Sequence, residues 1–198
     1  MLDTHARKYV DPYIDRSASM CLKLGLTPNQ VTVLSFIIGA TTGLWIGFEQ
    51  AWVAVVVLWI SGFLDAVDGA MARRTETTPF GTVLDVTFDR LVEISVILGI
   101  AYLHPDMLWA LLLLSVSIIF SMTVFLTVGA VSEKAGIKSF YYQAGVAERT
   151  EGFLFFTAMI LFPSYVLYMI LAFFIVETFT GLQRLLEAKR ILKKQAGR

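Results

Sequence analysis

Long apolar runs separated by short polar segments make up most of the chain. Six of these runs approach the roughly 20 residues that an α-helix needs to cross a bilayer, at residues 31–48, 51–64, 83–103, 108–131, 153–162 and 165–182. The second and fifth runs are short, so they reach that length only if their helices continue into the polar residues beside them. The pattern therefore predicts an all-α integral membrane protein with six transmembrane helices.

The residues before the first run predict an amphipathic helix that lies in the membrane interface, over residues 5–26. Asp11 is a candidate cap for this helix, and Pro12 suits a first helical turn. At helical spacing, one face is apolar and the opposite face is polar; the apolar face holds Val10, Tyr13, Ile14, Ala18, Cys21 and Leu24. We expect this face to turn towards the hydrocarbon.

The chain then restarts at Thr27, a predicted N-cap, with Pro28 as the first residue of the first span. The sequence shows no repeat at solenoid spacing and no low-complexity linker. We therefore expect a single membrane domain over residues 1–198, with a six-helix bundle at 27–185 and a basic cytosolic tail at 186–198.

Charge is distributed unevenly along this apolar chain. The sequence is 57% hydrophobic with a mean hydropathy of +0.70, and its formal net charge of zero gives no bulk attraction to nucleic acid. If the N-terminus is cytosolic and Arg90 is counted with the inner side, all sixteen Lys and Arg residues fall on that side. This positive-inside pattern predicts a multi-pass protein of the plasma membrane, with both termini facing the cytosol. Cys21 is the only cysteine, so no disulfide framework or cysteine-based metal site is expected.

Carboxylates gather at the cytosolic ends of the second and third spans. A helical second span places four residues on one stripe, namely Asp65, Asp68, Gly69 and Ala72. After a short loop, a four-residue spacing puts three more on one face of the third span, namely Gly81, Asp85 and Asp89. Two neighbouring antiparallel helices would bring the carboxylates together, with the two glycines leaving space beside them.

Clustered carboxylates at a membrane edge repel one another and need a compensating charge. Oxygen ligands without His or Cys favour hard cations, so we expect Mg²⁺ or Mn²⁺ in a site for one or two ions that a phosphate completes. Arg73 follows the first stripe and is placed to grip a phosphate oxygen. The chemistry that fits is phosphoryl transfer, with one carboxylate taking the proton from an attacking hydroxyl.

Two other interpretations of the aspartates remain open. In the first, they pair only with nearby arginines, Arg73, Arg74 and Arg90, and have no chemical role. In the second, the protein is a cation or proton transporter that uses intramembrane carboxylates. Transporter sites usually lie near the middle of the membrane between repeats, whereas these acids lie at one end and no inverted repeat is visible.

Residues 65–89 resemble the signature of the CDP-alcohol phosphotransferase family. That signature runs Asp, two residues, Asp-Gly, two residues, Ala-Arg, about eight residues, Gly, three residues, Asp, three residues, Asp. Every fixed position is matched, by Asp65, Asp68, Gly69, Ala72, Arg73, Gly81, Asp85 and Asp89. The departure is a segment of seven residues, 74–80, where the pattern has about eight. Because this segment contains Pro79 and is expected to be a loop, its shorter length should leave the helical spacing of Gly81, Asp85 and Asp89 unchanged.

The resemblance implies an enzyme that transfers a phosphoalcohol from a CDP-linked lipid donor to a hydroxyl and releases CMP. It implies that Asp65, Asp68 and Asp85 bind metal in a two-ion site, and that Asp89 binds metal or acts as the catalytic base. It also assigns contacts with the cytidine diphosphate to five residues, Asp65, Gly69, Ala72, Arg73 and Gly81. A homodimer is implied as well.

The acceptor is read from two further stretches. A phosphorylated acceptor needs cations of its own away from the metal, and "GVAERTE" and "LQRL" are similar to stretches in phosphatidylinositol-phosphate synthases and archaeal relatives. The resemblance implies that Arg149 and Arg184 hold the acceptor phosphate, with Lys134 and Lys138 as helpers. We expect a polyol phosphate, inositol 1-phosphate first. Glycerol 3-phosphate and a free alcohol such as serine remain open, as does a diacylglycerol or archaeol donor.

Overall fold

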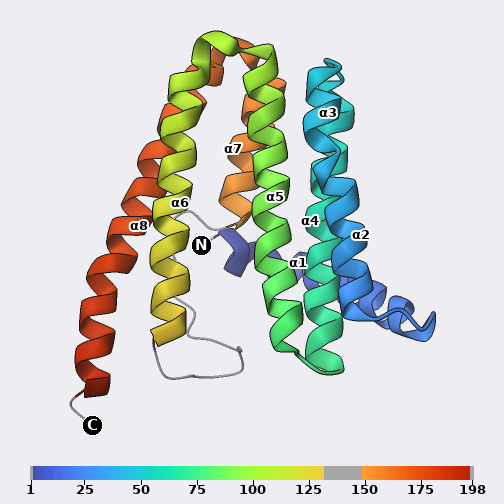
Figure 1. Cartoon of the computed structure of the whole chain (residues 1–198). Helices are drawn as coiled ribbons and strands as arrows, with labels where there is room; N and C mark the ends of the chain where they lie inside the picture. The colour runs from blue at the N-terminus through green and yellow to red at the C-terminus, as the bar shows by residue number, and fades with distance from the viewer. Residues whose placement is uncertain (1, 132–148, 197–198) are drawn as a thin grey trace. The chain divides into compact units, whose positions relative to one another are not determined.

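The computed structural model describes residues 2–131 and 149–196, and these residues form helices and turns without a strand. The chain divides into two compact units, Met1–Pro105 and Asp106–Arg198, which are described separately. The helices are labelled in Figure 1 and are α1 (Leu2–Lys23), α2 (Pro28–Ala40), α3 (Thr42–Gly47), α4 (Ala51–Arg74), α5 (Pro79–Leu103), α6 (Leu108–Val131), α7 (Arg149–Leu161) and α8 (Val166–Ala196). Single 3₁₀ turns at Pro105–Met107 and Pro163–Tyr165 precede α6 and α8.

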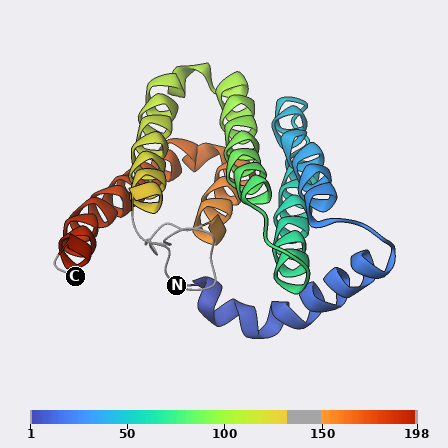
Figure 2. The ribbon, with the colours of Figure 1, turned by 60° about the horizontal axis from the view of Figure 1, so that its bottom comes forward.

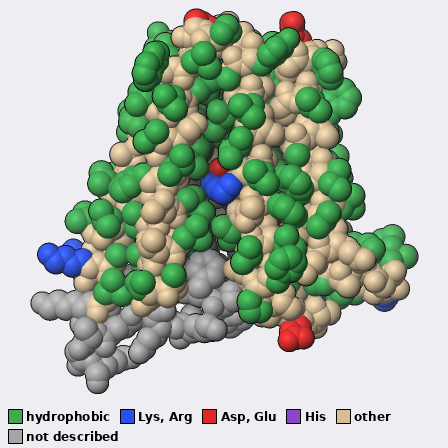
Figure 3. Space-filling view, viewed as in Figure 1, with side chains coloured by type: hydrophobic (Ala, Val, Ile, Leu, Met, Phe, Trp, Pro, Cys, Tyr) green, Lys and Arg blue, Asp and Glu red, His purple; other side chains and the backbone are tan. Residues whose placement is uncertain are grey.

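Four helical segments in the described part of the chain are long and apolar enough to cross a membrane. They are Pro28–Gly47, Ala51–Arg74, Pro105–Val131 and Pro163–Arg190. Hydrophobic side chains are accordingly spread over the face drawn in Figure 3, with few charged side chains among them. The described residues are all-helical, as predicted, and these four helices are consistent with an integral membrane protein. The count is four where six were expected, because α5 carries several charged residues within its 25 residues and α7 is described over only 13.

Two helix boundaries follow the local signals in the sequence. At the start of α2, the Gln30 backbone N–H donates to Thr27 Oγ1 at 3.3 Å, and the Thr27 N–H donates to Gln30 Oε1 at 2.9 Å. This reciprocal capping box, followed by Pro28, confirms the predicted start. α4 continues beyond its apolar run to Arg74, as a span of sufficient length required.

The predicted start of the N-terminal helix is wrong. Helix α1 begins at Leu2, so Asp11 is not its N-cap, and Pro12 lies in its interior. Proline removes one backbone hydrogen bond from a helix, but its fixed φ is itself compatible with helical geometry. Asp11 and Pro12, which resemble a helix start in the sequence, therefore lie well inside the helix.

The expected apolar face of α1 divides between two environments. Ala18 is fully buried in a cluster with residues of α4, and Ile14 and Cys21 pack against this cluster. Tyr13 and Leu24 remain 70% and 68% exposed. Figure 2 shows α1 running across the end of α4. Helix α1 is thus anchored on the first unit through only part of its apolar surface.

In the first unit, α2 and α3 pack against both α4 and α5. Glycines allow close contact: a Cβ on Gly43 would overlap the carbonyl oxygen of Ser95 in α5, and one on Gly39 would overlap the Ser61 hydroxyl in α4. The Ser35 hydroxyl donates to the Ser61 carbonyl oxygen at 2.8 Å, which ties α2 to α4. This close packing fixes α4 and α5 on a common support.

In the second unit, α8 packs against both α6 and α7. Gly181 of α8 lies against Phe120 of α6 with no room for a methyl group. The rings of Phe155 and Phe173 stack between α7 and α8, with centroids 4.8 Å apart. Close packing of α8 carries a basic residue, Arg184, into the interior of this unit, where it is 6% exposed.

Candidate metal and donor site

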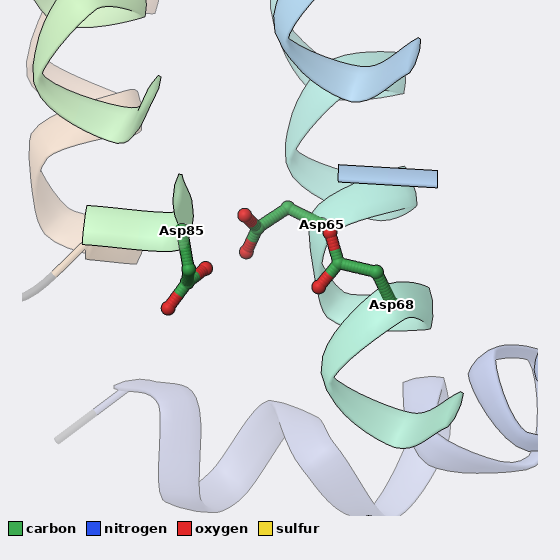
Figure 4. A group of neighbouring side chains, drawn as sticks. All are labelled: Asp65, Asp68 and Asp85. Carbon is green, nitrogen blue, oxygen red and sulfur yellow. The ribbon is translucent and has the colours of Figure 1, made fainter. Parts of the chain in front are cut away.

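Three of the predicted carboxylates converge within the first unit. Asp65 and Asp68 come from α4 and Asp85 comes from α5, and ligand oxygens of the three lie within 4.8 Å of one another. Figure 4 shows the carboxylates turned into the space beside the two helices, with α1 passing below them in that view. Asp68 is buried at 4% exposure, whereas Asp65 and Asp85 are half-buried. We call these residues the carboxylate cluster.

The local sequence explains this convergence. The three-residue step from Asp65 to Asp68 keeps both on one side of α4. Helix α5 begins at Pro79, where the Gly81 backbone N–H donates to Thr78 Oγ1 at 3.0 Å. This cap sets the start of α5, so that Asp85 falls on its second turn and faces the cluster.

The residues of the carboxylate cluster fit a divalent cation. Ligands of Mg²⁺ lie about 2.1 Å from the ion, so opposite ligands are roughly 4.2 Å apart. Oxygens within 4.8 Å of one another need only small side-chain movements to reach that arrangement. An oxygen-only donor set suits Mg²⁺ or Mn²⁺. The cluster can therefore hold a metal ion without rearrangement of its helices.

Asp89 stands apart from this group of three. It lies four residues beyond Asp85 on α5, a rise of roughly 6 Å along the helix, and is half-buried. Asp85 and Asp89 therefore lie along α5 as predicted. Of the four aspartates predicted to bind metal, however, the carboxylate cluster contains three. A role of Asp89 as ligand or base stays a prediction.

The small residues of the motif differ in the space around them. Among the residues that the structure describes, a Cβ on Gly69 would meet only Arg73 Nη1, at 3.4 Å, so this position is open beside the cluster. A Cβ on Gly81 would lie 3.0 Å from both Asn29 Oδ1 and Thr78 Oγ1. Asn29, in the first turn of α2, is therefore a polar neighbour of the site that the sequence reasoning missed, since no local spacing connects it with Gly81.

Two of the arginines proposed as partners of the aspartates bind other carboxylates. Arg74 Nη2 lies 2.7 Å from Asp15 Oδ1 of α1, and Arg74 Nη1 donates to the Asp15 carbonyl and the Ser19 hydroxyl. Arg90 Nη1 lies 2.5 Å from Glu93 Oε2 within α5. The interpretation of the cluster as ion pairs with nearby arginines is weakened accordingly. Glu93 was also missed, although it continues the four-residue spacing of Asp85 and Asp89.

The predicted acceptor residues belong to the second unit. Arg184 Nη1 donates to Ser121 Oγ at 3.1 Å, and its guanidinium lies 4.9 Å from the centre of the Phe125 ring. Arg149, the first residue of α7, lies over Phe153 at 5.4 Å. Lys134 and Lys138 lie outside the described residues. The contacts of Arg184 with Ser121 and Phe125, both on α6, fix the orientation of its guanidinium inside the second unit.

Membrane helices that carry a cluster of oxygen ligands suited to a divalent cation fit a membrane-embedded enzyme that acts on phosphates. The family model for CDP-alcohol phosphatidyltransferase matches residues 25–182, and the chain belongs to this family. It is 32% identical over 177 residues to the inner membrane protein YnjF of Escherichia coli (strain K12), covering 83% of this chain and 84% of that protein.

Inositol phosphate synthases are also similar to this chain. The archaetidylinositol phosphate synthase of Pyrococcus horikoshii is 38% identical over 96 residues, which cover 48% of this chain and 51% of that protein. The crystal structure of Mycobacterium tuberculosis phosphatidylinositol phosphate synthase with CDP-DAG bound matches with a TM-score of 0.73 and 25% identity, covering 88% of this chain and 92% of that one. A second structure of that synthase, in complex with manganese and citrate, has the same TM-score of 0.73 at 24% identity and supports the fold.

Family membership decides between the two functional classes that the sequence left open. The protein is an enzyme, a CDP-alcohol phosphatidyltransferase of phospholipid synthesis, and not a transporter. Its membrane location agrees with the four apolar helices and with the membrane-protein relative.

Proposed function

We propose that this enzyme transfers a phosphatidyl-type group from a CDP-linked lipid to the hydroxyl of a polyol phosphate and releases CMP. The observation that carries the proposal is the carboxylate cluster, in which three oxygens from two helices lie within 4.8 Å of one another. Such a cluster is costly at a membrane edge unless it serves a cation and the anionic group bound with it.

Asp65, Asp68 and Asp85 would hold the ion, and Asp89 would complete a site for two. Mg²⁺ or Mn²⁺ supplies positive charge that offsets the diphosphate of the donor. Asp89, one turn deeper on α5, would accept the proton of the acceptor hydroxyl. In the balanced reaction the acceptor oxygen forms a bond to the lipid-linked phosphorus, the bond from that phosphorus to the bridging oxygen breaks, and CMP leaves with this oxygen.

Donor binding is proposed for the open side of α4. A flat or phosphorylated group can approach the helix closely at Gly69, where the one neighbour of a Cβ within the described part of the chain is the flexible Arg73. Arg73 is exposed and offers a forked set of donors to phosphate oxygens. The small residues Ala72 and Gly81 would leave space for the donor on the adjacent surface. Asp65 would contact the nucleotide as well as the ion.

For the acceptor we propose inositol 1-phosphate, held by Arg149 and Arg184, with Lys134 and Lys138 as helpers. The support is the fixed guanidinium of Arg184 and the similarity to proteins named as inositol phosphate synthases. Glycerol 3-phosphate or serine as acceptor keeps the same chemistry and is the second candidate.

We also propose the finer topology: six spans, with α5 and α7 crossing the membrane, and α1 in the interface. The one-sided distribution of basic residues supports cytosolic termini and a cytosolic carboxylate cluster. The domain is proposed to be single over residues 1–198 and to function as a homodimer.

One panel of reactions tests these proposals. The purified enzyme with Mg²⁺ receives CDP-diacylglycerol or CDP-archaeol, and each of inositol 1-phosphate, glycerol 3-phosphate, inositol, glycerol and serine. The expected result is CMP release with inositol 1-phosphate and none from the folded Asp68→Asn variant. Turnover confined to glycerol 3-phosphate would correct the acceptor, and turnover confined to an unphosphorylated alcohol would remove the phosphate-binding role of the arginines.

A further inference from the structure

Glu93 is a buried acid in the middle of α5 that the proposed chemistry does not use. It lies four residues after Asp89 and eight after Asp85, so it extends the acidic stripe one turn deeper. Its exposed fraction is 7%, and its Oε2 lies 2.5 Å from Arg90 Nη1. A carboxylate at this depth is costly by itself, and so is an arginine. The two therefore form a pair whose presence needs a reason.

Glu93 determines where the charge of Arg90 lies. Without a partner, a long arginine side chain in a span extends towards the interface. The contact with Glu93, one turn further from the start of α5, draws the guanidinium in the opposite direction. Arg90 Nε is buried and has no hydrogen-bond partner among the residues that the structure describes. The guanidinium is thus held at the level of Glu93 and not at the end of the helix.

This placement acts on the carboxylate cluster through charge. Arg90 follows Asp85 by five residues, a rise of roughly 7.5 Å, so its guanidinium is on the order of 10 Å from an ion bound there. At about 10 Å, a unit charge changes the affinity for a divalent cation by roughly fourfold even with the dielectric constant of water, and by more in a less polar medium. Arg90 lowers cation affinity and favours anions, and Glu93 has the opposite direct effect.

We propose that Arg90 and Glu93 form a charge-positioning pair that sets the balance between cation and phosphate binding at the carboxylate cluster. This inference rests on the proposed function of that cluster. Arg90 weakens the hold of the carboxylates on the metal and supplies positive charge for the phosphates of the donor. Glu93 acts through Arg90 by keeping the guanidinium at this depth, and the two charges nearly cancel at long range.

The test is Mn²⁺ binding to the purified full-length protein without substrate, followed by electron paramagnetic resonance of the free ion. Arg90→Gln is expected to bind Mn²⁺ at least about threefold more tightly than wild type, and Glu93→Gln at least about threefold more weakly. The double variant Arg90→Gln/Glu93→Gln should return to near wild-type affinity. Arg90→Lys, which keeps the charge, should also remain near wild type.

The same variants are then assayed for CMP release. Arg90→Gln is expected to raise KM for the CDP-linked donor, although it binds Mn²⁺ more tightly, and Arg90→Lys is expected to rescue part of that loss. Weaker Mn²⁺ binding in both single variants would instead mean that the pair only supports the fold, and would overturn the proposal. Unchanged affinity in both would overturn it as well.

Asp68→Asn separates this inference from the function on which it rests. If Asp68→Asn binds Mn²⁺ as well as wild type does, the proposed metal site itself fails. If Asp68→Asn loses binding while the Arg90 and Glu93 variants do not show opposite shifts, only the charge-positioning pair fails. Variants that do not fold, as judged by helical circular dichroism, are replaced by Arg90→Lys and the double variant, whose expected near-equality with wild type can still be contradicted.

Discussion

Replacement of Gly69 by alanine tests whether this glycine is needed for ligand binding or for the stability of the fold. Of the described residues, the added methyl group would meet only Arg73, at 3.4 Å from Nη1, the far end of a flexible side chain. In a helix interior, alanine is favoured over glycine by about 0.5 to 1 kcal/mol. For a protein of this length we therefore expect Gly69→Ala to keep or raise the melting temperature, by up to about 4 °C.

Activity should respond in the opposite direction. If the donor approaches the α4 backbone at Gly69, the methyl group overfills the bound complex, and overpacking of this kind costs about 1 to 3 kcal/mol. That penalty corresponds to a loss of roughly five- to 150-fold in kcat/KM for the CDP-linked donor. The assay is CMP release at varied donor concentration, beside thermal unfolding of the same preparation.

Gly47→Ala is the matched control. Its methyl group would lie 3.6 Å from the Tyr102 ring, an ordinary van der Waals contact, at the end of α3. We expect this variant to keep wild-type stability and kcat/KM. Wild-type donor kinetics in Gly69→Ala would refute the idea that Gly69 leaves room for the donor. A large fall in the melting temperature of this variant would contradict the presence of space for a methyl group at Gly69.

Three further predictions concern the cluster, its support and the acceptor. Asp68→Asn should lose Mn²⁺ binding and at least about 100-fold in CMP release while staying folded, because it removes a buried ligand charge; wild-type turnover would contradict its role. Gly43→Ala should destabilise the protein by about 1 to 3 kcal/mol in thermal unfolding, because its methyl group would overlap the Ser95 carbonyl; unchanged unfolding would mean that α3 and α5 separate freely. Arg184→Ala should weaken acceptor use by about 1.5 to 3 kcal/mol in kcat/KM and leave the donor KM unchanged; equal effects on both substrates would argue against a specific acceptor contact.

The sequence predicted the features of this protein that depend on local spacing. The continuation of the second span to Arg74 followed from its short apolar run, and the start of α2 followed from the Thr27 capping signal. The meeting of Asp65, Asp68 and Asp85 followed from helical periodicity on two neighbouring spans. Each of these results needs only the geometry of a helix and the thickness of a bilayer.

What the sequence did not predict depends on contacts between distant residues. The ion pair of Arg74 with Asp15 joins residues on α4 and α1, and the position of Asn29 beside Gly81 joins α2 to α5. The Pro12 rule failed for a different reason: α1 continues through Pro12, although an interior proline removes a backbone hydrogen bond and normally kinks or ends a helix. Local rules give candidate boundaries, and packing decides among them.

The two faces of α5 show how the support and the carboxylate cluster depend on each other. One side of the helix packs closely on α2 and α3, where Ser95 meets Gly43 and Phe88 stacks on Phe36 with centroids 4.2 Å apart. Another side carries the acidic stripe that begins at Asp85. Because repelling carboxylates push their helices apart, the opening of the cluster has to be resisted elsewhere. The glycine contacts provide this resistance, since α4 and α5 both pack on α2 and α3. Close packing in the apolar part of the unit is therefore a condition for a preformed carboxylate cluster at its polar end.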